Sequence, residues 1–395
     1  MTHLMPTTPG PHPAFGVYVH IPFCLVRCHY CDFNAYAGME HLAEDYVDAL
    51  VAQMRHEANQ REVETIFFGG GTPTRIPLSS IQRVLLALKD NFNIKPGAEI
   101  TIEANPETID GPMLDGLLAC GFDRISIGVQ STDQEVLTAL GRAHGPTKGL
   151  DAIKGAIRAG FKHVSGDLIY GTPGESSDSW RRSLGDVIDA GVGHLSAYAL
   201  TVEQGTPLHG FVQKGTFPAP DEDVQADRYL IAHETLEDAG FVRYEVSNWA
   251  KEGAWCRHNL GYWRSDDYLG IGAGAHGHIA GRRYWSVRSL QAYISRSPET
   301  EDGFESLTPP QRIEEAAIMG LRLAAGLDRA AFASRWGSDP ADLFAGELAA
   351  FIDDGTVAVT DERLYVAPGS LFVSDRVAEA LIGALDKEGL STRVG

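Results

Sequence analysis

Six strand-like segments alternate with helix-like segments over the first two thirds of the chain, and this alternation limits the choice of fold more than any other feature. The strand-like runs, rich in apolar and β-branched residues, cover residues 16–20, 65–68, 99–103, 124–129, 163–169 and 194–200. Amphipathic helical patterns cover residues 40–59, 78–92, 108–120, 133–140, 147–159 and 178–190, and a further one covers 222–239. Strands that alternate with helices typically form a parallel sheet. The pattern therefore predicts an α/β fold with six consecutive β/α units.

Polar or glycine-rich residues follow each of these strands at its C-terminal end. They are a three-cysteine loop, a glycine run at 69–71, Glu103, Gln130, Asp167 with Tyr170, and Tyr198. Turn residues gather at strand ends in any protein, but this does not explain an acidic Glu103 inside a β-branched run or Asp167 before two apolar residues. Barrel-like parallel sheets build their active sites at this edge. We therefore expect the functional site there.

The loop after the first strand contains Cys24, Cys28 and Cys31 in the spacing C-x3-C-x2-C. A four-iron cluster normally takes four thiolates, so three leave one iron without a protein ligand. An open metal position is where a metal site performs chemistry. The alternative is a structural zinc site with His20 or His29 as the fourth ligand.

Five sequence runs together carry a family resemblance. They are IPFC at 21–24, FGGGTPT at 68–74, IEANP at 102–106, GVQS at 128–131 and DLIYG at 167–171. Over residues 15–280 the chain resembles the radical S-adenosylmethionine (SAM) enzymes, in the subgroup around the oxygen-independent coproporphyrinogen III oxidase. The resemblance implies a partial (β/α)6 TIM-like barrel. It also implies a [4Fe-4S] cluster on the three cysteines, with SAM bound at the open iron and its sulfonium split by an electron from the cluster.

The same resemblance implies which residues hold SAM: Tyr18, Tyr30, Gly70, Gly71, Thr72, Glu103, Gln130, Arg142 and Asp167. Glycines allow the backbone to approach a ligand closely, and a carboxylate can bind ribose hydroxyls or an ammonium group. Arginine offers a fork of donors to a carboxylate. Two alternatives stay open: Arg142 could be a surface residue at a helix end, and the two tyrosines could simply pack in the core.

Three features point to one branch of this subgroup. The oxidases carry a further cysteine two places after the third ligand, where this chain has Phe33, and a long N-terminal arm, where only 23 residues precede Cys24. The chain also has an H-N-x-x-Y-W motif at 258–263. In all three it resembles the paralogous radical SAM haem chaperones (HemW-like proteins). The resemblance implies haem as cargo, an acceptor protein and an electron donor. The alternative function is oxidation of coproporphyrinogen III, which we do not expect. Whether the protein cleaves SAM stays open. Modification of RNA is a third, weaker hypothesis.

The motif supplies the residues proposed to hold haem. Imidazole is a common axial ligand of haem iron, and the macrocycle favours aromatic walls. His258 could therefore bind the iron while Tyr262 and Trp263 line the pocket, with Cys256 as an alternative thiolate ligand. The residues alone also allow a histidine that hydrogen-bonds within a loop beside two core aromatics.

The C-terminal quarter has a different pattern. Helical patterns at 310–325, 328–336 and 340–353 precede a hairpin at 355–366 and a last helix from about 374, which suggests a winged-helix-like unit. From Ser306 onward it holds 14 acidic and 8 basic residues, a poor balance for binding DNA. We expect a lid or docking domain. The predicted divisions are a flexible tail at 1–14, the barrel at 15–240, a connecting region with the motif at 241–305, and this domain at 306–395.

Charge and composition restrict the partners. A formal net charge of −20 argues against a long phosphate-binding surface, so nucleic acid is not an expected partner. No apolar run approaches 18 residues, and the first 14 residues lack the apolar segment of a signal peptide. Five cysteines are too few for a disulfide scaffold in 395 residues. These features predict a cytoplasmic protein without a membrane span, and they leave homodimerisation open.

Overall fold

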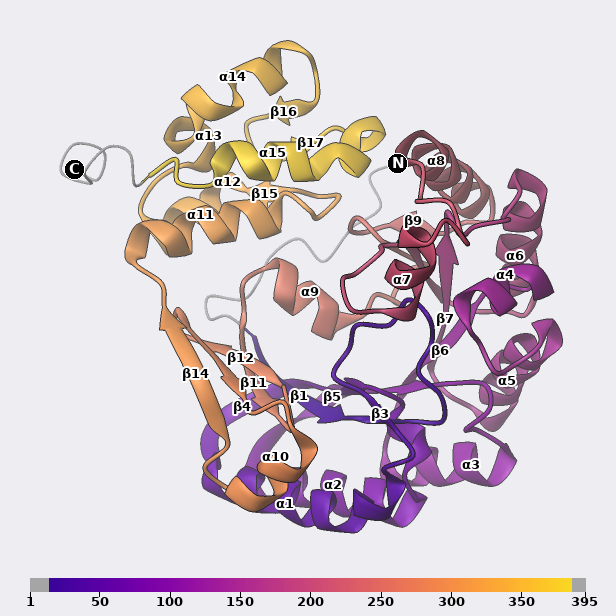
Figure 1. Ribbon diagram of the computed structural model, residues 1–395. Helices are drawn as coiled ribbons and strands as arrows, with labels where there is room; N and C mark the ends of the chain where they lie inside the picture. The colour runs from indigo at the N-terminus through magenta and orange to yellow at the C-terminus, as the bar shows by residue number, and fades with distance from the viewer. Residues whose placement is uncertain (1–13, 386–395) are drawn as a thin grey trace.

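The computed structural model describes residues 14–385 and is built around one twelve-stranded sheet (Figure 1). Its six central strands are parallel and follow the chain in order. These strands are β1 Phe15–Ile21, β4 Asn59–Gly70, β5 Phe92–Ala104, β6 Arg124–Gln130, β7 His163–Tyr170 and β8 His194–Ala199. The predicted parallel α/β sheet with six β/α units is thereby confirmed.

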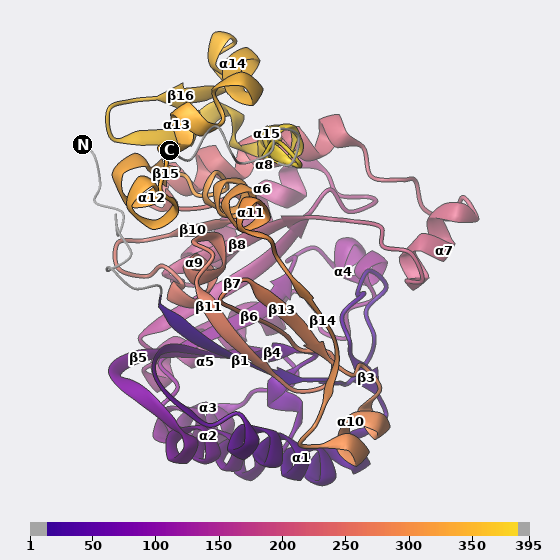
Figure 2. The same cartoon turned by 90° about the vertical axis from the view of Figure 1, so that its left-hand side faces the viewer.

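The helices between the parallel strands form an arc around the outside of the sheet (Figure 1). They are α1 Ala43–His56, α2 Leu78–Asn91, α3 Gly111–Cys120, α4 Gln134–Leu140, α5 Pro146–Ala159 and α6 Ser177–Asp189. After β8 come α7 Pro207–Gln213, which projects from the body of the protein (Figure 2), and α8 Glu222–Asp238. Short 3-10 turns lie at Glu40–Leu42 and Pro73–Arg75, and the cysteine loop contains the small strands β2 Phe23–Cys24 and β3 Tyr36–Ala37. No helix within residues 14–385 is both long and apolar enough to cross a membrane.

Residues 241–305, predicted as a connecting region, extend the sheet at both edges. Strand β11 Asp267–Ile271 pairs in parallel with β1, and β12 His276–Ile279, β13 Arg282–Ser286 and β14 Glu301–Ser306 follow it in antiparallel order. At the other edge, β10 Asn248–Ala250 and β9 Val242–Arg243 continue from β8. The region also forms α9 Arg257–Trp263 and α10 Leu290–Arg296.

The two faces of the parallel strands differ in polarity. On the outer face, residues such as Ile100, Ile102 and Ile125 are buried against the helices in the main hydrophobic core. Because side chains alternate across a strand, the inner face carries the intervening residues, which are mostly polar. On β5, these are Glu99, Thr101 and Glu103. The sheet therefore has an apolar outside and a polar inside, as expected for a barrel that holds a charged ligand.

The C-terminal unit has its own hydrophobic core, which includes Phe344, Leu348 and Leu364. Its elements are α11 Pro309–Gly320, β15 Leu327–Asp328, α12 Arg329–Trp336, α13 Pro340–Leu343, α14 Ala345–Asp353, β16 Val357–Val359, β17 Arg363–Val366, a 3-10 segment at Pro368–Val373 and α15 Ser374–Leu381. The three strands pair in the order β15-β17-β16. The predicted helices and hairpin are present, but the helix predicted at 340–353 is divided at Phe344.

Helix α9 lies between the barrel and the C-terminal unit (Figures 1 and 2). It closes the end of the barrel where the strands begin. Glu99 and Arg124 form a buried ion pair there, with 3.1 Å between Oε2 and Nε. Arg124 also donates to the carbonyl oxygens of Ala254 and Trp255, which lead into α9, and Glu99 accepts the backbone N–H of His258 at 3.1 Å. Long-range contacts, rather than a local cap, therefore hold this seven-residue helix in place.

Candidate functional site

The three cysteines lie at the C-terminal end of β1, where the sequence predicted the site. Cys28 is buried, Cys24 and Cys31 are partly exposed, and all three are free thiols. Two backbone hydrogen bonds fix the loop: Tyr36 donates to the carbonyl oxygen of Pro22 at 2.7 Å, and His29 donates to that of Leu140 at 2.9 Å. The second bond ties the loop to the end of α4.

The glycine run after β4 packs directly against the cysteine loop. Gly71 donates to the carbonyl oxygen of Ile21 at 2.9 Å, and a Cβ at Gly71 would lie only 3.0 Å from the Cys24 Sγ. Gly70 has φ of 113°, and a Cβ there would lie 2.6 Å from the ring of His20. Thr72 continues the contact, with its Oγ1 at 3.6 Å from the Cys24 Sγ. Only glycine allows this approach at 70 and 71, so the two loops form one surface.

Arg142 connects the cysteine loop to β5. Its Nη1 lies 3.4 Å from the Cys28 Sγ, and its Nη2 donates to the Oδ1 of Asn105 at 2.6 Å. Asn105 in turn donates to the Oγ1 of Thr72 at 2.8 Å. The alternative of a surface arginine is therefore wrong. The Nε of Arg142 is buried without a hydrogen-bond partner, which leaves a donor for an anionic group such as a carboxylate.

Two carboxyl groups face the barrel interior beside this surface. Glu103 accepts the backbone N–H of Gly70 at 3.2 Å. Burial, helped by the nearby carboxylate of Asp167, raises the pKa of Glu103 to about 8. Burial also raises the pKa of Asp167, although hydroxyl donors from Ser196, Ser126 and Ser165 act against this rise. Two half-buried carboxyl groups without a neighbouring cation suit a positively charged ligand.

The remaining predicted SAM residues lie at different depths. Gln130 ends β6 with φ of 67°, a conformation that is uncommon outside glycine and that often persists at functional sites. Tyr18 stacks on Phe67 with 6.2 Å between ring centroids, at the polar face of the barrel. Tyr30 packs in a small apolar cluster that includes Leu140. Contact of these residues with SAM stays a prediction.

The donor set fits an iron–sulfur cluster better than a zinc ion. A zinc ion needs four ligands about 2.0–2.3 Å from a single point, and no group of three or more His, Cys, Asp or Glu converges in this way within residues 14–385. The two histidines considered as a fourth ligand are engaged elsewhere. His20 Nε2 lies 2.8 Å from the carbonyl oxygen of Asn34, and His29 Nδ1 lies 2.9 Å from that of Ala139. A cluster with its own sulfides accepts thiolates that stand farther apart.

Four site residues had no role in the sequence interpretation: Asn105 and the three serines around Asp167. Asn105 follows Glu103 by two positions, and one serine lies on each of β6, β7 and β8. The signal was available as a two-residue period of polar side chains along strands whose other face is apolar. That period indicates a polar barrel interior. The prediction of the strands rested on their apolar residues and not on this polar period.

His258 is buried in the barrel base, and both of its ring nitrogens already have partners. Its Nδ1 lies 2.8 Å from the Oγ1 of Thr65, and its Nε2 lies 2.9 Å from the hydroxyl of Tyr262. Burial lowers the pKa of His258 to about 4, so the ring is neutral. Burial also raises the pKa of the Cys256 thiol, which disfavours the thiolate that iron ligation requires.

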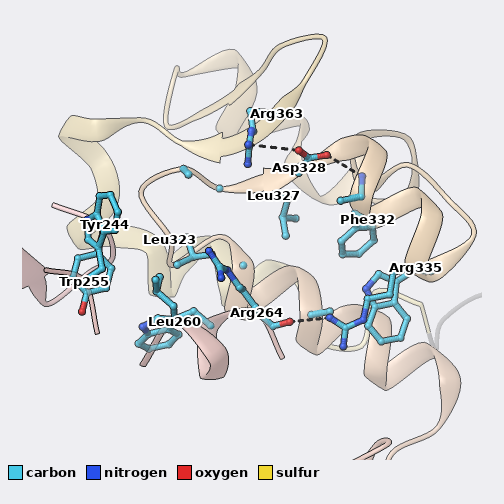
Figure 3. A pocket seen from close by; sticks show the side chains of 17 residues that line it. Tyr244, Trp255, Leu260, Arg264, Leu323, Leu327, Asp328, Phe332, Arg335 and Arg363 are labelled. Carbon is cyan, nitrogen blue, oxygen red and sulfur yellow. Dashed lines mark hydrogen bonds and ion pairs between the residues drawn. The ribbon is translucent and has the colours of Figure 1, made fainter. Parts of the chain in front are cut away.

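The aromatic residues of the motif face different spaces. Trp263 packs toward the C-terminal unit, where the Arg322 guanidinium lies 5.6 Å from its ring centroid. It lines a narrow crevice of about 100 Å³, shown in Figure 3, where Leu260 and Leu323 meet. Tyr262 instead borders a cavity of about 400 Å³ that also contains Glu103 and Gly70; we call this the barrel cavity. His258 and Tyr262 also line a cavity of about 420 Å³ at the barrel base, which Trp263 does not border. The three motif residues proposed to hold haem thus do not all share one pocket in this structure.

Comparisons with known proteins agree with this geometry. Residues 18–187 match the model of the radical SAM superfamily, and residues 307–371 match the HemN C-terminal domain. The heme chaperone HemW of Mycobacterium tuberculosis (strain ATCC 25618 / H37Rv) is 40% identical over 384 residues, which cover 95% of this chain and 96% of the relative. The heme chaperone HemW of Bacillus subtilis (strain 168) is 32% identical over 381 residues, 94% of this chain and 100% of the relative.

Among solved structures, the fold is similar to that of coproporphyrinogen III oxidase (HemN) from Escherichia coli, a radical SAM enzyme. The TM-score is 0.81 at 25% identity, and the match covers 94% of this chain and 91% of the oxidase. The whole architecture, C-terminal unit included, is therefore shared with a radical SAM protein.

Proposed function

Because the chain belongs to the HemW family of radical SAM proteins, we propose that it is a haem chaperone, which binds haem and delivers it to an acceptor protein. The observation that carries the proposal is similarity to the chaperones along almost the full length of both chains. The H-N-x-x-Y-W motif, one of the features on which the resemblance rests, lies in α9 at the barrel base.

The cluster and SAM sites support a radical SAM architecture for this function. Cys24, Cys28 and Cys31 would hold the cluster, which when bound supplies an open iron and an electron. Glu103 and Asp167 would face the cationic groups of SAM, and the unpartnered Nε of Arg142 would face its carboxylate. The apolar helices outside the barrel keep water from the opposite face of the sheet. The chain thus would place acidic side chains at one side of a bound SAM molecule and an arginine at the other.

The second candidate is oxidation of coproporphyrinogen III, which the similarity to HemN favours. Phe33 counts against it, because the resemblance to the oxidases requires a cysteine there. Phe33 is 62% exposed and borders the barrel cavity, so a thiol is missing from the position where a substrate would pass. The lower identity to HemN, 25% against 40% for the chaperone, points the same way.

One experiment separates the two functions. The protein is reconstituted anaerobically with iron and sulfide, titrated with haem, and then supplied with SAM, a reductant and coproporphyrinogen III. We expect stoichiometric haem binding and no protoporphyrinogen IX. Turnover of porphyrinogen in proportion to SAM consumed would establish the oxidase instead.

The proposal includes partners and a location. A low-potential electron donor has to reduce the cluster, and an acceptor protein has to receive the haem. The cytoplasm suits a protein whose thiols must stay reduced for cluster assembly. Association of two copies is measured in the same reconstitution by size-exclusion chromatography with and without haem.

A further inference from the structure

The mouth of the barrel cavity is formed by residues to which the cluster and SAM sites give no role. Phe33, His276 and Arg288 line the cavity and are exposed, whereas Glu103 and Gly70, at the proposed SAM surface, line it and are partly buried. The cavity of about 400 Å³ lies within the size range of pockets for organic ligands. A ligand at this mouth would therefore lie beside SAM and keep one edge in solvent.

The cysteine loop holds the segments that form this mouth. The Nδ2 of Asn34 donates to the carbonyl oxygens of Ala273 at 2.9 Å and Arg288 at 3.0 Å, and the Tyr36 hydroxyl donates to that of Arg288 at 3.0 Å. Gly274 has φ of 73°, and a Cβ there would lie 2.7 Å from the Asn34 Nδ2. The turn before β12 and the segment before α10 thus take their positions from the loop that carries the cysteines.

His276, the first residue of β12, brings an available imidazole to the mouth. Both ring nitrogens of His20, the other histidine of the cavity, have partners within 3.1 Å. His276 makes no hydrogen bond or ion pair within residues 14–385, and its ring packs against Trp285 with 5.9 Å between centroids. Partial burial lowers the pKa of His276, and the guanidinium of Arg288 lowers it further, so the ring is neutral. An exposed neutral imidazole without a hydrogen-bond partner is a good ligand for a metal ion.

The charges of the mouth suit an anionic ligand. Glu103 is the one carboxyl group in the cavity lining, and with a pKa of about 8 it is mostly protonated at pH 7. The Arg288 side chain has no hydrogen-bond or ion-pair partner in the part of the chain that the structure describes, and arginine offers carboxylates a fork of donors. Phe33, Tyr18 and Tyr268 add aromatic walls. The lining therefore suits a flat macrocycle that carries a central metal and carboxylates.

We propose that haem binds at the mouth of the barrel cavity, with His276 as an axial ligand of its iron and Arg288 bound to one propionate. This inference rests on the proposed haem-chaperone function and assigns it a site. The second propionate and one edge of the macrocycle stay in solvent, where an acceptor protein can reach them. The axial ligand comes from outside the H-N-x-x-Y-W motif, whose His258 is held by Thr65 and Tyr262.

The test of His276 is a haem titration of the full-length protein with its cluster reconstituted, so that the three cysteines are not free to bind haem iron. Soret absorption and electron paramagnetic resonance report the axial ligand. His276→Ala should bind haem about tenfold more weakly and lose the spectrum of an imidazole-ligated iron. His276→Gln should show the same loss, and added imidazole should restore the spectrum in His276→Gly. His56→Ala, at the exposed end of α1, is the control.

A second titration tests the propionate contact. Arg288→Gln should weaken haem binding by up to about fivefold, as expected for an exposed ion pair, and leave the spectrum unchanged. The dimethyl ester of haem has no charged propionates, so wild-type protein and Arg288→Gln should bind it equally. A difference that persists with the ester would show that Arg288 does not act through a propionate.

Three results separate this inference from the proposed function. If wild-type protein binds haem one to one but His276→Ala and His276→Gln keep its affinity and spectrum, the inference is wrong and the chaperone proposal stands. If His258→Ala removes the imidazole spectrum instead, the iron lies at the barrel base and the inference is again wrong. If wild-type protein binds no haem, the proposed function itself fails. Iron incorporation during reconstitution shows that each variant is folded.

Discussion

Glu103 and Asp167 place two carboxyl groups in the barrel interior. Neither has a cationic partner, and burial raises the pKa of both. The serines around Asp167 donate hydrogen bonds that favour its charged form, whereas Glu103 receives only the N–H of Gly70. Because the pKa of Glu103 is about 8, a bound cation near neutral pH would ionise this carboxyl group.

Glu103→Gln tests this difference. With a pKa of about 8, Glu103 is mostly protonated at pH 7, and binding a cation to its carboxylate must release a proton. The affinity for SAM should therefore rise with pH up to about 8, by at most tenfold per pH unit, and then level off. In Glu103→Gln, the affinity should be lower and this slope absent. Equilibrium dialysis at pH 6.5, 7.5 and 8.5 measures both. An unchanged slope would remove Glu103 from the site, and Glu135→Gln on the exposed face of α4 is the control.

Cys28→Ser tests the cluster ligands. The buried Cys28 thiol is the one that Arg142 contacts, and its loss removes one of three thiolates. The variant should lose the visible absorption of the cluster and most bound iron after reconstitution. Cys120→Ser, at the end of α3, should keep both. A full iron complement in Cys28→Ser would show that the ligand assignment is mistaken.

At the scale of elements, what could be predicted depended on local signals. The parallel strands and their helices were found because each has a clear period and a length of five residues or more. Strand β14, with the sequence EDGFES, looks like a loop, since its residues are mostly exposed and charged. Helix α9 has no side-chain cap at Cys256, and its position depends on Glu99, which is 159 residues away in the chain.

The site shows the same division. Cysteine spacing and glycine runs are local, so the cluster loop and its neighbours could be predicted. The partners of His258 are Thr65, 193 residues away in the chain, and Tyr262. No sequence period reports the contact with Thr65, and iron ligation by His258 stays a prediction.

The buried ion pair behind α9 gives a prediction for this element. Arg124→Met leaves the Glu99 carboxylate buried without its partner, which typically costs about 3–5 kcal/mol of unfolding free energy. Burial would raise the pKa of Glu99, but Arg124 and the N–H of His258 outweigh it and lower the pKa. The stabilisation is therefore complete above the unfolded pKa and disappears as pH falls through the lower folded value. Thermal unfolding at pH 7 should show a clear loss in Arg124→Met and a smaller one in the double variant Arg124→Met/Glu99→Met. Equal losses would show that the unpaired Glu99 carboxylate is not what destabilises Arg124→Met.

At the scale of the whole molecule, two cores meet around α9. The main core lies between the sheet and its helices, and the C-terminal unit has its own. Arg335 of α12 joins them by donating to the carbonyl oxygen of Arg264 (Figure 3) and to that of Ser265, just after α9. Arg243 donates to the carbonyl oxygen of Pro368 at 2.6 Å from the other side. A cavity of about 950 Å³, lined by residues of β13 and α11, lies along this junction, so its width depends on how the two cores sit against each other.

The partition formed by Tyr262 and Tyr268 has a thermodynamic consequence. Both rings border the barrel cavity and the cavity of about 950 Å³ beside α11. A ring that borders two cavities cannot move for one occupant without changing the space of the other, so ligands that occupy the two cavities have linked binding equilibria. Linkage is reciprocal: if SAM changes the affinity for haem by some factor, haem changes the affinity for SAM by the same factor. Titrating each ligand in the presence and absence of the other measures both factors. If the two ligands occupy these cavities, Tyr262→Ala should bring both affinity factors toward one, because the ring that the two cavities share is then absent.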